Sequence, residues 1–396
     1  MLKDLDTRTP VLILGGKENS LSLARHFGRL GIPVRASGPA NCWAMYSRYC
    51  RERFPIPHGQ DFGAFWEDLL LSEANNRLDG HIVLACSDEA LEFLARRRDR
   101  LAPRYILDDA DPALQEALLD KRRTLELAQA AGVGTPKFWT IKSHADLEPL
   151  KDSVLFPVMV KPIHSHKFTR VFGCKLFIVE RSFDELSRKV RAAQEHNIDV
   201  MIVEMIPGPD ELLSSYYTYV DKAGNNLFHF TKRVLRRFPM NRGGACYHIT
   251  EWLPETAELG QKFFKAVRFR GLGNIEFKRD LRDGQLKIIE VNSRFTAAQE
   301  LVVRSGAPIN LIIYCYLTGQ AGPQFKEYRQ FLRYWYPLRD ALAFLEMRRR
   351  GELSLAGWLR SVLPYRHVFP LWDWGDPMPS LGAAGAALQQ AVRGRA

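Results

Sequence analysis

Two carboxylates and an amide that lie close together in the sequence could bind a divalent cation. The stretch Gly273–Arg294 predicts two strands joined by a turn, with Glu276 on the first strand and Glu290 and Asn292 on the second. Side chains two positions apart on a strand project from the same face, so the hairpin can present all three groups at one place. Such a set of oxygen ligands suits Mg²⁺ held jointly by the protein and by nucleotide phosphates.

Arg294 follows this group and would put a fixed cation beside the metal, where a phosphoryl or acyl group reacts. The alternative is a solvated hairpin edge that carries ordinary surface charges. Glu290 argues against that alternative, because it lies in the otherwise apolar run KIIEV, where an unpaired carboxylate is costly to bury.

Two lysines earlier in the chain could contribute positive charge to the same site. Lys161 is embedded in the apolar run FPVMVKP, and a lysine in such a strand indicates a charge placed for a purpose. Lys121 follows Asp120 in a predicted helix over residues 118–134. A lone lysine on a helix usually belongs to a solvated face, so Lys121 depends on its context for a role.

The order of these residues resembles the ATP-grasp superfamily. The metal-binding end of that family has a Glu, a spacer, a Glu-x-Asn and an Arg two positions further on, and this chain matches all four positions. In the family two lysines reach the phosphates, adenine binds at a hinge around a Glu-x-Ile, and a Glu seven residues later binds the ribose. The resemblance implies metal ligands Glu276, Glu290 and Asn292, nucleotide-binding residues Lys121, Lys161, Glu204, Met205, Ile206 and Glu211, and catalytic residues Arg294 and Lys161.

Within the superfamily, the chain most resembles the predicted carboxylate–amine ligases, a group that includes D-aspartate ligase. The resemblance implies that a carboxylate attacks the γ-phosphate of ATP to give an acyl phosphate and ADP, and that an amine then displaces phosphate. The implied cofactors are ATP and Mg²⁺, with Mn²⁺ as an alternative, and the implied partners are a small carboxylate and a small amine. Carboxylation through carboxyphosphate and a non-catalytic ATP-binding scaffold are the alternative functions.

The segment between Lys161 and residue 174 departs from the family pattern. Most relatives have a glycine-rich loop there, which cradles phosphates through backbone N–H groups. This chain has HSHKFTRVFG instead, with a single glycine, so side-chain cations would replace some backbone donors. His164 and His166 could also indicate a metal cluster, although two histidines without a nearby cysteine or carboxylate are weak evidence for one.

The pattern of elements predicts an α/β protein in three parts. Residues 1–110, with a β-Gly-Gly-α-β opening, predict an open α/β domain of the kind that precedes the ATP-grasp fold. Residues 111–320 predict the ATP-grasp domain itself, of α+β type, which includes a strand over Leu227–Thr231 followed by a basic loop over residues 232–246. Residues 321–396 predict a basic, Trp-rich and mainly helical C-terminal region.

Composition narrows the functional classes only a little. The 396 residues carry a formal net charge of +11, and no apolar run is long enough to span a bilayer. Met1–Pro10 lacks the apolar segment of a secretory signal, and the six cysteines fit neither a zinc site nor a disulfide framework, so we expect a cytoplasmic protein. A nucleic-acid partner is not expected, because no basic stripe with interleaved aromatic residues has the spacing of a known module.

The C-terminal region leaves two interpretations open. Leu338, Leu342 and Leu345 repeat with helical spacing, and Arg348–Arg350 follow them. Such a helix could lie on the anionic inner face of a membrane. The pattern fits better a helical appendage that packs on the body of the protein.

Overall fold

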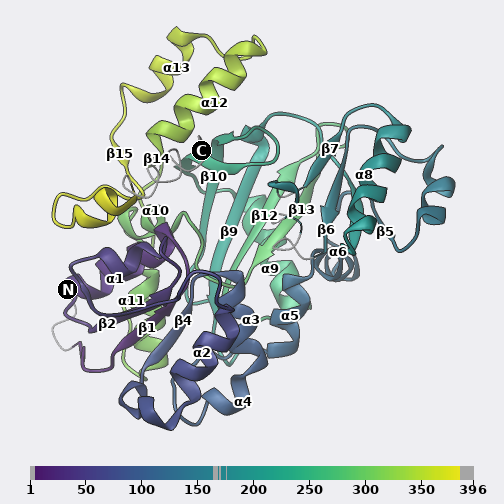
Figure 1. Ribbon diagram of the computed structural model, residues 1–396. Helices are drawn as coiled ribbons and strands as arrows, with labels where there is room; N and C mark the ends of the chain where they lie inside the picture. The colour runs from purple at the N-terminus through teal and green to yellow at the C-terminus, as the bar shows by residue number, and fades with distance from the viewer. Residues whose placement is uncertain (1–4, 164–167, 169–170, 175, 384–396) are drawn as a thin grey trace.

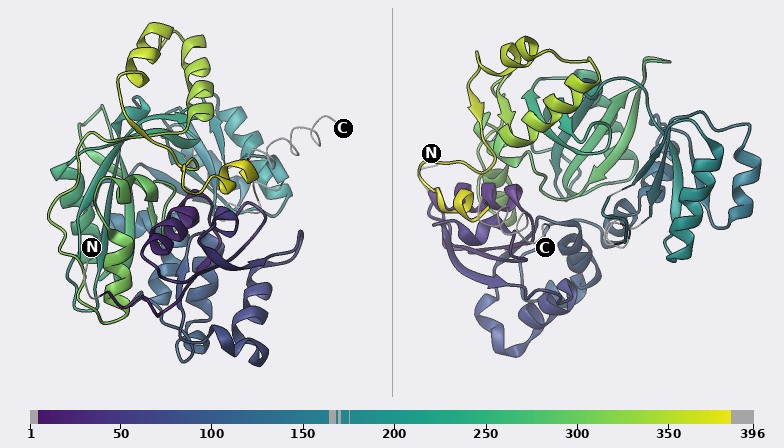
Figure 2. Two further views of the ribbon diagram at one scale, coloured as in Figure 1. Left: turned by 90° about the vertical axis from the view of Figure 1, so that its left-hand side faces the viewer. Right: turned by 45° about the horizontal axis from the view of Figure 1, so that its top comes forward.

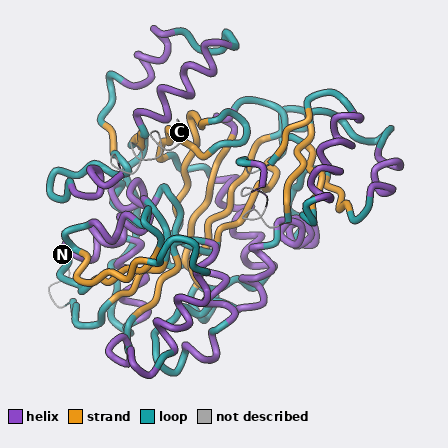
Figure 3. The backbone as a smooth tube through the Cα atoms, viewed as in Figure 1, coloured by secondary structure: helices purple, strands orange, loops and turns teal. Residues whose placement is uncertain are grey.

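The computed structural model describes residues 5–163, 168, 171–174 and 176–383, and three β-sheets organise this part of the chain (Figure 1). The N-terminal sheet is parallel, whereas the small sheet and most of the large central sheet are antiparallel. The strands of the central sheet run through the middle of the molecule, and helices cover its sides (Figure 3). This mixed architecture confirms the predicted fold class.

The N-terminal sheet has the strand order β3-β2-β1-β4. Strand β1 leads directly into Gly15 and Gly16, which both have positive φ angles. A Cβ atom on Gly16 would lie 2.5 Å from the Cβ of Cys86, so only glycine lets this turn approach the end of β4. The elements are β1 (Val11–Leu14), α1 (Glu18–Arg29), β2 (Val34–Gly38), β3 (Cys50–Pro55), α2 (Phe62–Leu71), β4 (Ile82–Ala85), α3 (Asp88–Arg96) and α4 (Arg98–Leu101).

The small sheet has the order β5-β8-β6-β7 and positions Lys161. Along β6, Val158 and Val160 are buried against the apolar core that includes α8, and Met159 and Lys161 alternate with them on the other face. The strand's alternation therefore turns Lys161 away from the core of this sheet. The elements are β5 (Phe138–Ile141), β6 (Val158–Pro162), β7 (Phe177–Val179), α8 (Phe183–Glu195) and β8 (Val200–Glu204).

The central sheet has the order β13-β12-β9-β10-β11-β14-β15. Its first two strands form the predicted hairpin, which is confirmed. Gly284, with a φ of 70°, closes the turn by donating its N–H to Asp280 O at 2.8 Å. The strands are β9 (Leu213–Val220), β10 (Phe230–Phe238), β11 (Gly244–Thr250), β12 (Gly271–Arg279), β13 (Leu286–Asn292), β14 (Arg333–Trp335) and β15 (His367–Val368).

The helix predicted over residues 118–134 is wrong as a single element. The structure has α5 (Pro112–Leu119) and α6 (Lys121–Ala130), with Asp120 in an extended conformation between them. The Asp120 carboxylate accepts hydrogen bonds from the backbone N–H groups of Arg122 and Arg123. An aspartate at this position satisfies the free N–H groups of a helix start, so it begins a new helix at Lys121.

The basic loop predicted from residue 232 is also wrong, because β10 continues to Phe238. A bulge after Val234 interrupts the register with β11 and sends neighbouring arginines in different directions. Arg236 pairs with Asp340, whereas Arg237 pairs with Asp210. The cations of this segment therefore occupy fixed positions on a strand.

The region beyond residue 320 extends the central sheet by two strands and carries a helical hairpin. Its helices α12 (Pro337–Arg349) and α13 (Leu355–Val362) project beyond one end of the sheet (Figures 1 and 2). The buried carboxylate of Asp340 binds Arg236 and accepts from the indole N–H groups of Trp335 and Trp358. The remaining helices of the central unit are α9 (Pro254–Ala266), α10 (Gln299–Arg304) and α11 (Ile309–Leu317).

Among the helices in the described ranges, none has both the length and the apolar character needed to cross a bilayer.

Candidate functional site

Four neighbouring strands place a row of polar residues on one face of the central sheet. The register pairs Glu290 on β13 with Glu276 on β12, Glu276 with Ser215 on β9, and Ser215 with Lys232 on β10. Directly paired residues in an antiparallel sheet point to the same face. The predicted meeting of Glu276 and Glu290 is therefore present, and a lysine lies two strands away from them.

The negative charges of Glu276 and Glu290 repel each other. Burial raises the pKa of Glu276, and the charge of Glu290 raises it further. Lys232 counteracts this rise, and its own pKa is lowered because it is buried. Its Nζ donates to Ser215 Oγ at 3.1 Å, which directs the ammonium along the row. Two facing carboxylates of this kind are stabilised by any cation that contacts both.

Asn292 follows Glu290 by two residues on β13. Its amide nitrogen donates to Glu290 Oε1 at 3.1 Å and contacts Asn274 Oδ1 at 3.4 Å. The nitrogen thus holds the amide beside Glu290, and the amide oxygen is the atom that a cation would contact.

Arg294 leaves the hairpin and reaches the N-terminal sheet. Its Nε donates to Asp88 Oδ1 at 2.5 Å, at the first residue of α3. Next to it, the Asn19 side chain donates to the carbonyl oxygens of Cys86 and Phe295, both at 2.7 Å. Arg294 is thereby fixed between the central sheet and the end of β4, and its charge still acts on Glu276.

Lys161 of the small sheet and Lys121 at the start of α6 lie near the hairpin. Burial, together with the positive charge of Lys121, lowers the pKa of Lys161 to about 8. Glu290 acts in the opposite direction on the same group. The structure therefore brings two predicted cations and one predicted metal ligand within electrostatic range, although they come from three different elements.

The segment after β8, where the resemblance places the hinge, is held by hydrogen bonds from other parts of the chain. Lys278, on β12, donates its Nζ to Ile206 O at 3.0 Å and Gly208 O at 2.7 Å, and Met205 N donates to Pro157 O. Glu204 is buried and pairs with Arg282 at 2.6 Å. The carboxylate of Glu204 is therefore committed to the protein, while the backbone around Met205 and Ile206 is held by the two sheets.

Of the two acids that follow the hinge, Asp210 and Glu211, the structure buries the first. Arg237 Nε donates to Asp210 Oδ1 at 2.6 Å, and Asp210 also acts on the pKa of Lys278. Glu211, which the spacing predicted, is exposed on a short 3₁₀ turn (η4, Asp210–Leu212). Asp210 is therefore committed to Arg237, and the role predicted for Glu211 stays a prediction.

The residues present fit a divalent cation. Glu276 and Glu290 face each other across a ladder pair, and burial together with the charge of Glu290 raises the pKa of Glu276. Carboxylate and amide oxygens are the ligand types that Mg²⁺ takes in proteins. Within the described ranges, no group of three or more His, Cys, Asp and Glu side chains comes together as a further metal cluster.

Two curated proteins resemble the sequence, and no family model matches it. D-aspartate ligase of Enterococcus faecium (strain Aus0004) is 22% identical over 241 residues, which cover 57% of this chain and 56% of that protein. The vancomycin/teicoplanin A-type resistance protein VanA of Enterococcus faecium is 27% identical over 188 residues, which cover 44% of this chain and 52% of that protein. The chain spans about half the length of these relatives.

Solved structures share the architecture over most of the chain. Biotin carboxylase from Campylobacter jejuni, in complex with β-γ-ATP, has a TM-score of 0.64 at 16% identity and covers 81% of this chain and 74% of its own. N5-carboxyaminoimidazole synthetase from Staphylococcus aureus has a TM-score of 0.60 at 14% identity, with 82% and 81% covered. The chain has the ATP-grasp fold. L-amino acid ligase from Bacillus licheniformis has a TM-score of 0.57 at 18% identity, with 79% and 75% covered.

One predicted part of the ATP-grasp site lies outside the described residues. His164, His166, Lys167 and Arg170 belong to the segment in which we expected side-chain cations to replace a glycine-rich loop. Their proposed contacts with phosphate stay predictions.

Sequence reasoning placed Lys232 in a basic loop and not beside the carboxylates, and it did not connect Asp88 with Arg294. Lys232 carried a signal, because it extends an apolar strand pattern from Phe228 and is charged at a position of the buried face. Asp88 carried none, because it meets Arg294 only through the packing of the N-terminal sheet on the hairpin.

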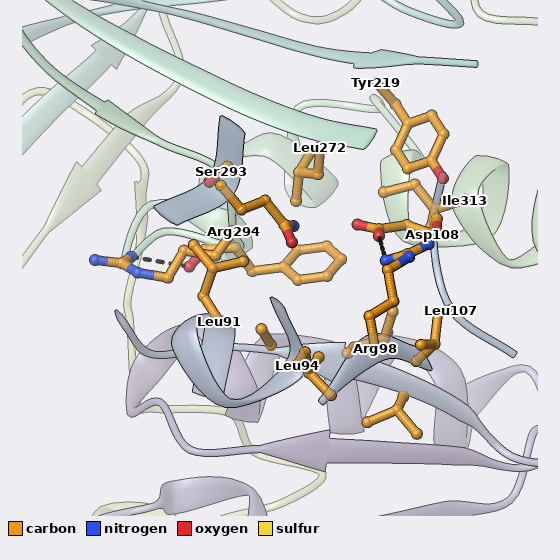
Figure 4. Close-up of a pocket in the computed structure, with 15 residues that line it drawn as sticks. Leu91, Leu94, Arg98, Leu107, Asp108, Tyr219, Leu272, Ser293, Arg294 and Ile313 are labelled. Atoms are coloured by element: carbon orange, nitrogen blue, oxygen red, sulfur yellow. Dashed lines mark hydrogen bonds and ion pairs between the residues drawn. The ribbon is translucent and has the colours of Figure 1, made fainter. Parts of the chain in front are cut away.

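A cavity of about 30 Å³ lies behind Arg294, where β4 and α3 face β9 and β12 (Figure 4). Tyr219 and Ser293 point toward it, and the Asp108–Arg98 ion pair bounds one end. Gln115 Oε1, Tyr219 Oη and Ser293 Oγ are buried, and no hydrogen-bond partner for them is found within the described ranges. The size of the cavity and its three polar atoms suit one or two buried waters, at about 10–15 Å³ for each.

Proposed function

We propose that the chain is an ATP-dependent carboxylate–amine ligase, which forms an amide or peptide bond through an acyl phosphate and releases ADP and phosphate. The observation that carries the proposal is the pair Glu276–Glu290, which lies near Lys161, Lys232 and Arg294 on an ATP-grasp fold. The similarity to D-aspartate ligase supports an amine as acceptor. The L-amino acid ligase of similar fold shows that this architecture also carries ligation of amino acids.

In this proposal, the nucleotide lies between the small sheet and the central sheet. Lys121 and Lys161 bind its phosphate oxygens, and the backbone at Met205 and Ile206 binds the adenine. Glu204 supports the hinge through Arg282, and its carboxylate does not contact the base. The ribose hydroxyls have two candidate partners, Asp210 and Glu211. We favour Glu211, because it is exposed, whereas the buried Asp210 carboxylate is committed to Arg237 as that of Glu204 is to Arg282.

The proposal also assigns the parts of the chain. Residues 1–110 contribute to the acceptor side, residues 111–320 bind nucleotide and metal, and residues 321–396 form the basic C-terminal region. The acceptor side would begin at Asp88, which contacts Arg294 from the first of these parts.

Glu276, Glu290 and Asn292 would hold Mg²⁺, or Mn²⁺ in its place. When bound, the cation would neutralise the charge that develops on the transferring phosphoryl group.

The protein's own residues account for the rest of the mechanism by position and charge. The carboxylate oxygen of the substrate attacks the γ-phosphorus, and the bond to ADP breaks while Lys161 stabilises the departing phosphate charge. The amine nitrogen then attacks the acyl carbon, the carbon–oxygen bond to phosphate breaks, and the amine loses a proton. Arg294 and Lys232 donate to the oxygen that becomes negative in this second step.

A phosphate-release screen tests the function. The protein, Mg²⁺ and ATP are incubated with pooled carboxylates and pooled amino acids, together and separately, and Glu290→Gln serves as the matched inactive control. We expect release of phosphate only when both a carboxylate and an amine are present. Release that depends on bicarbonate would replace the proposal with the carboxylation alternative. ATP binding without release in any pool would favour the scaffold alternative.

A further inference from the structure

Helix α12 packs one face on the body of the protein, and its opposite, apolar face is exposed in the part of the chain that the structure describes. Asp340, Ala343 and Phe344 are buried against the body of the protein. On the other side of the helix, Leu338 is 76% exposed and Leu345 is 46% exposed, with Leu342 between them. Residues at i, i+4 and i+7 fall on one face of a helix, so these leucines form a continuous stripe. A solvated helix face normally carries polar residues, and here it does not.

The stripe ends in a cluster of arginines. Arg348, Arg349 and Arg350 occupy the last turn and the cap of α12, and all three are exposed. Arg360 on α13 and Arg366 after it are exposed as well. Residues 337–366 contain six arginines and three acidic residues, of which Asp340 is buried in its pair with Arg236. The surface of the hairpin is therefore strongly basic.

The inner contacts of the hairpin fix how it presents this surface. Asp340 receives hydrogen bonds from Arg236, Trp335 and Trp358, which anchors both helices to β10 and β14. Phe344 stacks on Trp358 with ring centroids 5.0 Å apart. The leucine stripe is thus held away from the core by a rigid base and cannot turn inward without breaking a buried ion pair.

We propose that the hairpin α12–α13 docks on the surface of an anionic lipid bilayer. Leu338, Leu342 and Leu345 enter the boundary between head groups and acyl chains, and the arginines contact lipid phosphates. A helix with an apolar stripe and flanking arginines matches the chemistry of such a surface on both counts.

Charge decides between a membrane and a second copy of this chain. A second copy would present the same stripe and the same arginines, and like charges would then face each other. Besides Asp340, the acids of the hairpin are Glu352, which is exposed, and Glu346, which is half-buried and already pairs with Arg350 at 3.2 Å. An anionic bilayer supplies the negative charge that a second copy of this chain lacks on the same surface.

Co-sedimentation with vesicles tests the proposal on the full chain. One set of vesicles is phosphatidylcholine alone, and the other contains about a third phosphatidylglycerol. Leu338→Glu/Leu345→Glu removes the stripe, and Arg348→Glu/Arg349→Glu removes part of the basic cluster. The matched controls are Leu155→Glu, at a leucine that is 58% exposed elsewhere, and Arg51→Glu/Arg53→Glu, at exposed positions of β3.

We expect the wild-type chain to sediment with the anionic vesicles at low salt and much less with the neutral ones. Each hairpin variant should bind at least about 10-fold more weakly. The two arginines together, or the two inserted leucines together, contribute more than about a factor of ten to the binding constant. The controls should bind like the wild type, and the melting temperature of every variant should stay close to the wild-type value. Added salt should release the protein, since exposed charges are screened.

Three results would overturn the proposal. The first is an absence of wild-type sedimentation with anionic vesicles at low salt. The second is an equal loss in Arg51→Glu/Arg53→Glu, which would reduce the effect to net charge. The third is a lipid-free dimer in analytical ultracentrifugation that Leu338→Glu/Leu345→Glu converts to a monomer, because the stripe would then be an interface between copies.

Discussion

The charge on Lys161 should make nucleotide affinity depend on pH in a way that the structure specifies. In the free protein its pKa is about 8, because burial and Lys121 disfavour the charged form. A bound phosphate favours the charged form and raises this pKa, so the contribution to affinity is complete below about pH 8 and is lost above it. If binding requires the protonated amine, the dissociation constant rises by a factor of about 1 + 10^(pH − 8), which is about tenfold between pH 7 and pH 9.

Calorimetry of a non-hydrolysable ATP analogue with Mg²⁺ measures this effect. Near pH 8 the binding heat should depend on the ionisation enthalpy of the buffer, because binding takes up a fraction of a proton. Lys161→Arg is the matched control, since a guanidinium stays charged throughout this range and should flatten the pH dependence. It also separates Lys161 from Lys278, whose pKa is likewise lowered to about 8. An affinity that does not change from about pH 7 to about pH 9, or an unchanged decline in Lys161→Arg, would refute the reasoning.

Three further predictions follow from individual contacts. Glu290→Gln should lower turnover by more than about 100-fold and leave the circular dichroism spectrum unchanged, because an amide replaces a metal-binding carboxylate at little steric cost; normal turnover would show that the metal assignment is wrong. Asp340→Ala should lower the free energy of unfolding in urea by about 3–5 kcal/mol, since it leaves Arg236 buried and unpaired, whereas Glu92→Ala, in an exposed pair, should cost at most about 1 kcal/mol. Glu211→Gln should weaken ATP binding more than Asp210→Asn does, because the Asp210 carboxylate is already paired with Arg237, and the reverse order would assign the ribose to Asp210.

The hairpin and the order of the site residues could be predicted from the sequence because the relevant signals are local. Glu276 meets Glu290 as expected, but the register shifts between Glu276 and Phe277, which pairs with Ile288, so this meeting depends on a bulge as well as on the turn and the alternation. The same local reasoning did not identify Asp120 as a helix cap, although the cap is what separates Lys121 from the preceding helix.

The remaining features depend on contacts between distant parts of the chain. Asp88 and Arg294 are 206 positions apart and meet only through the packing of two sheets. A single 3₁₀ turn decides that Asp210 and not Glu211 is buried, which no count of residues reveals. The leucine pattern correctly predicted an apolar face on α12. The structure leaves that face exposed, and Asp340 and Phe344 belong to the face that is buried. The ion pair between Asp340 and Arg236 stabilises this orientation of the helix, and its two residues are 104 positions apart in the sequence.

We propose that this chain binds ATP through a cation held by Glu276, Glu290 and Asn292. Isothermal titration with a non-hydrolysable ATP analogue, in the presence of Mg²⁺ and then of excess EDTA, tests it most directly. The account predicts saturable binding to one site per chain that is strongly weakened by EDTA and by Glu276→Gln/Glu290→Gln, while the fold of the variant is unchanged. Absence of nucleotide binding with Mg²⁺ present, or equal affinity in the double variant, would contradict it.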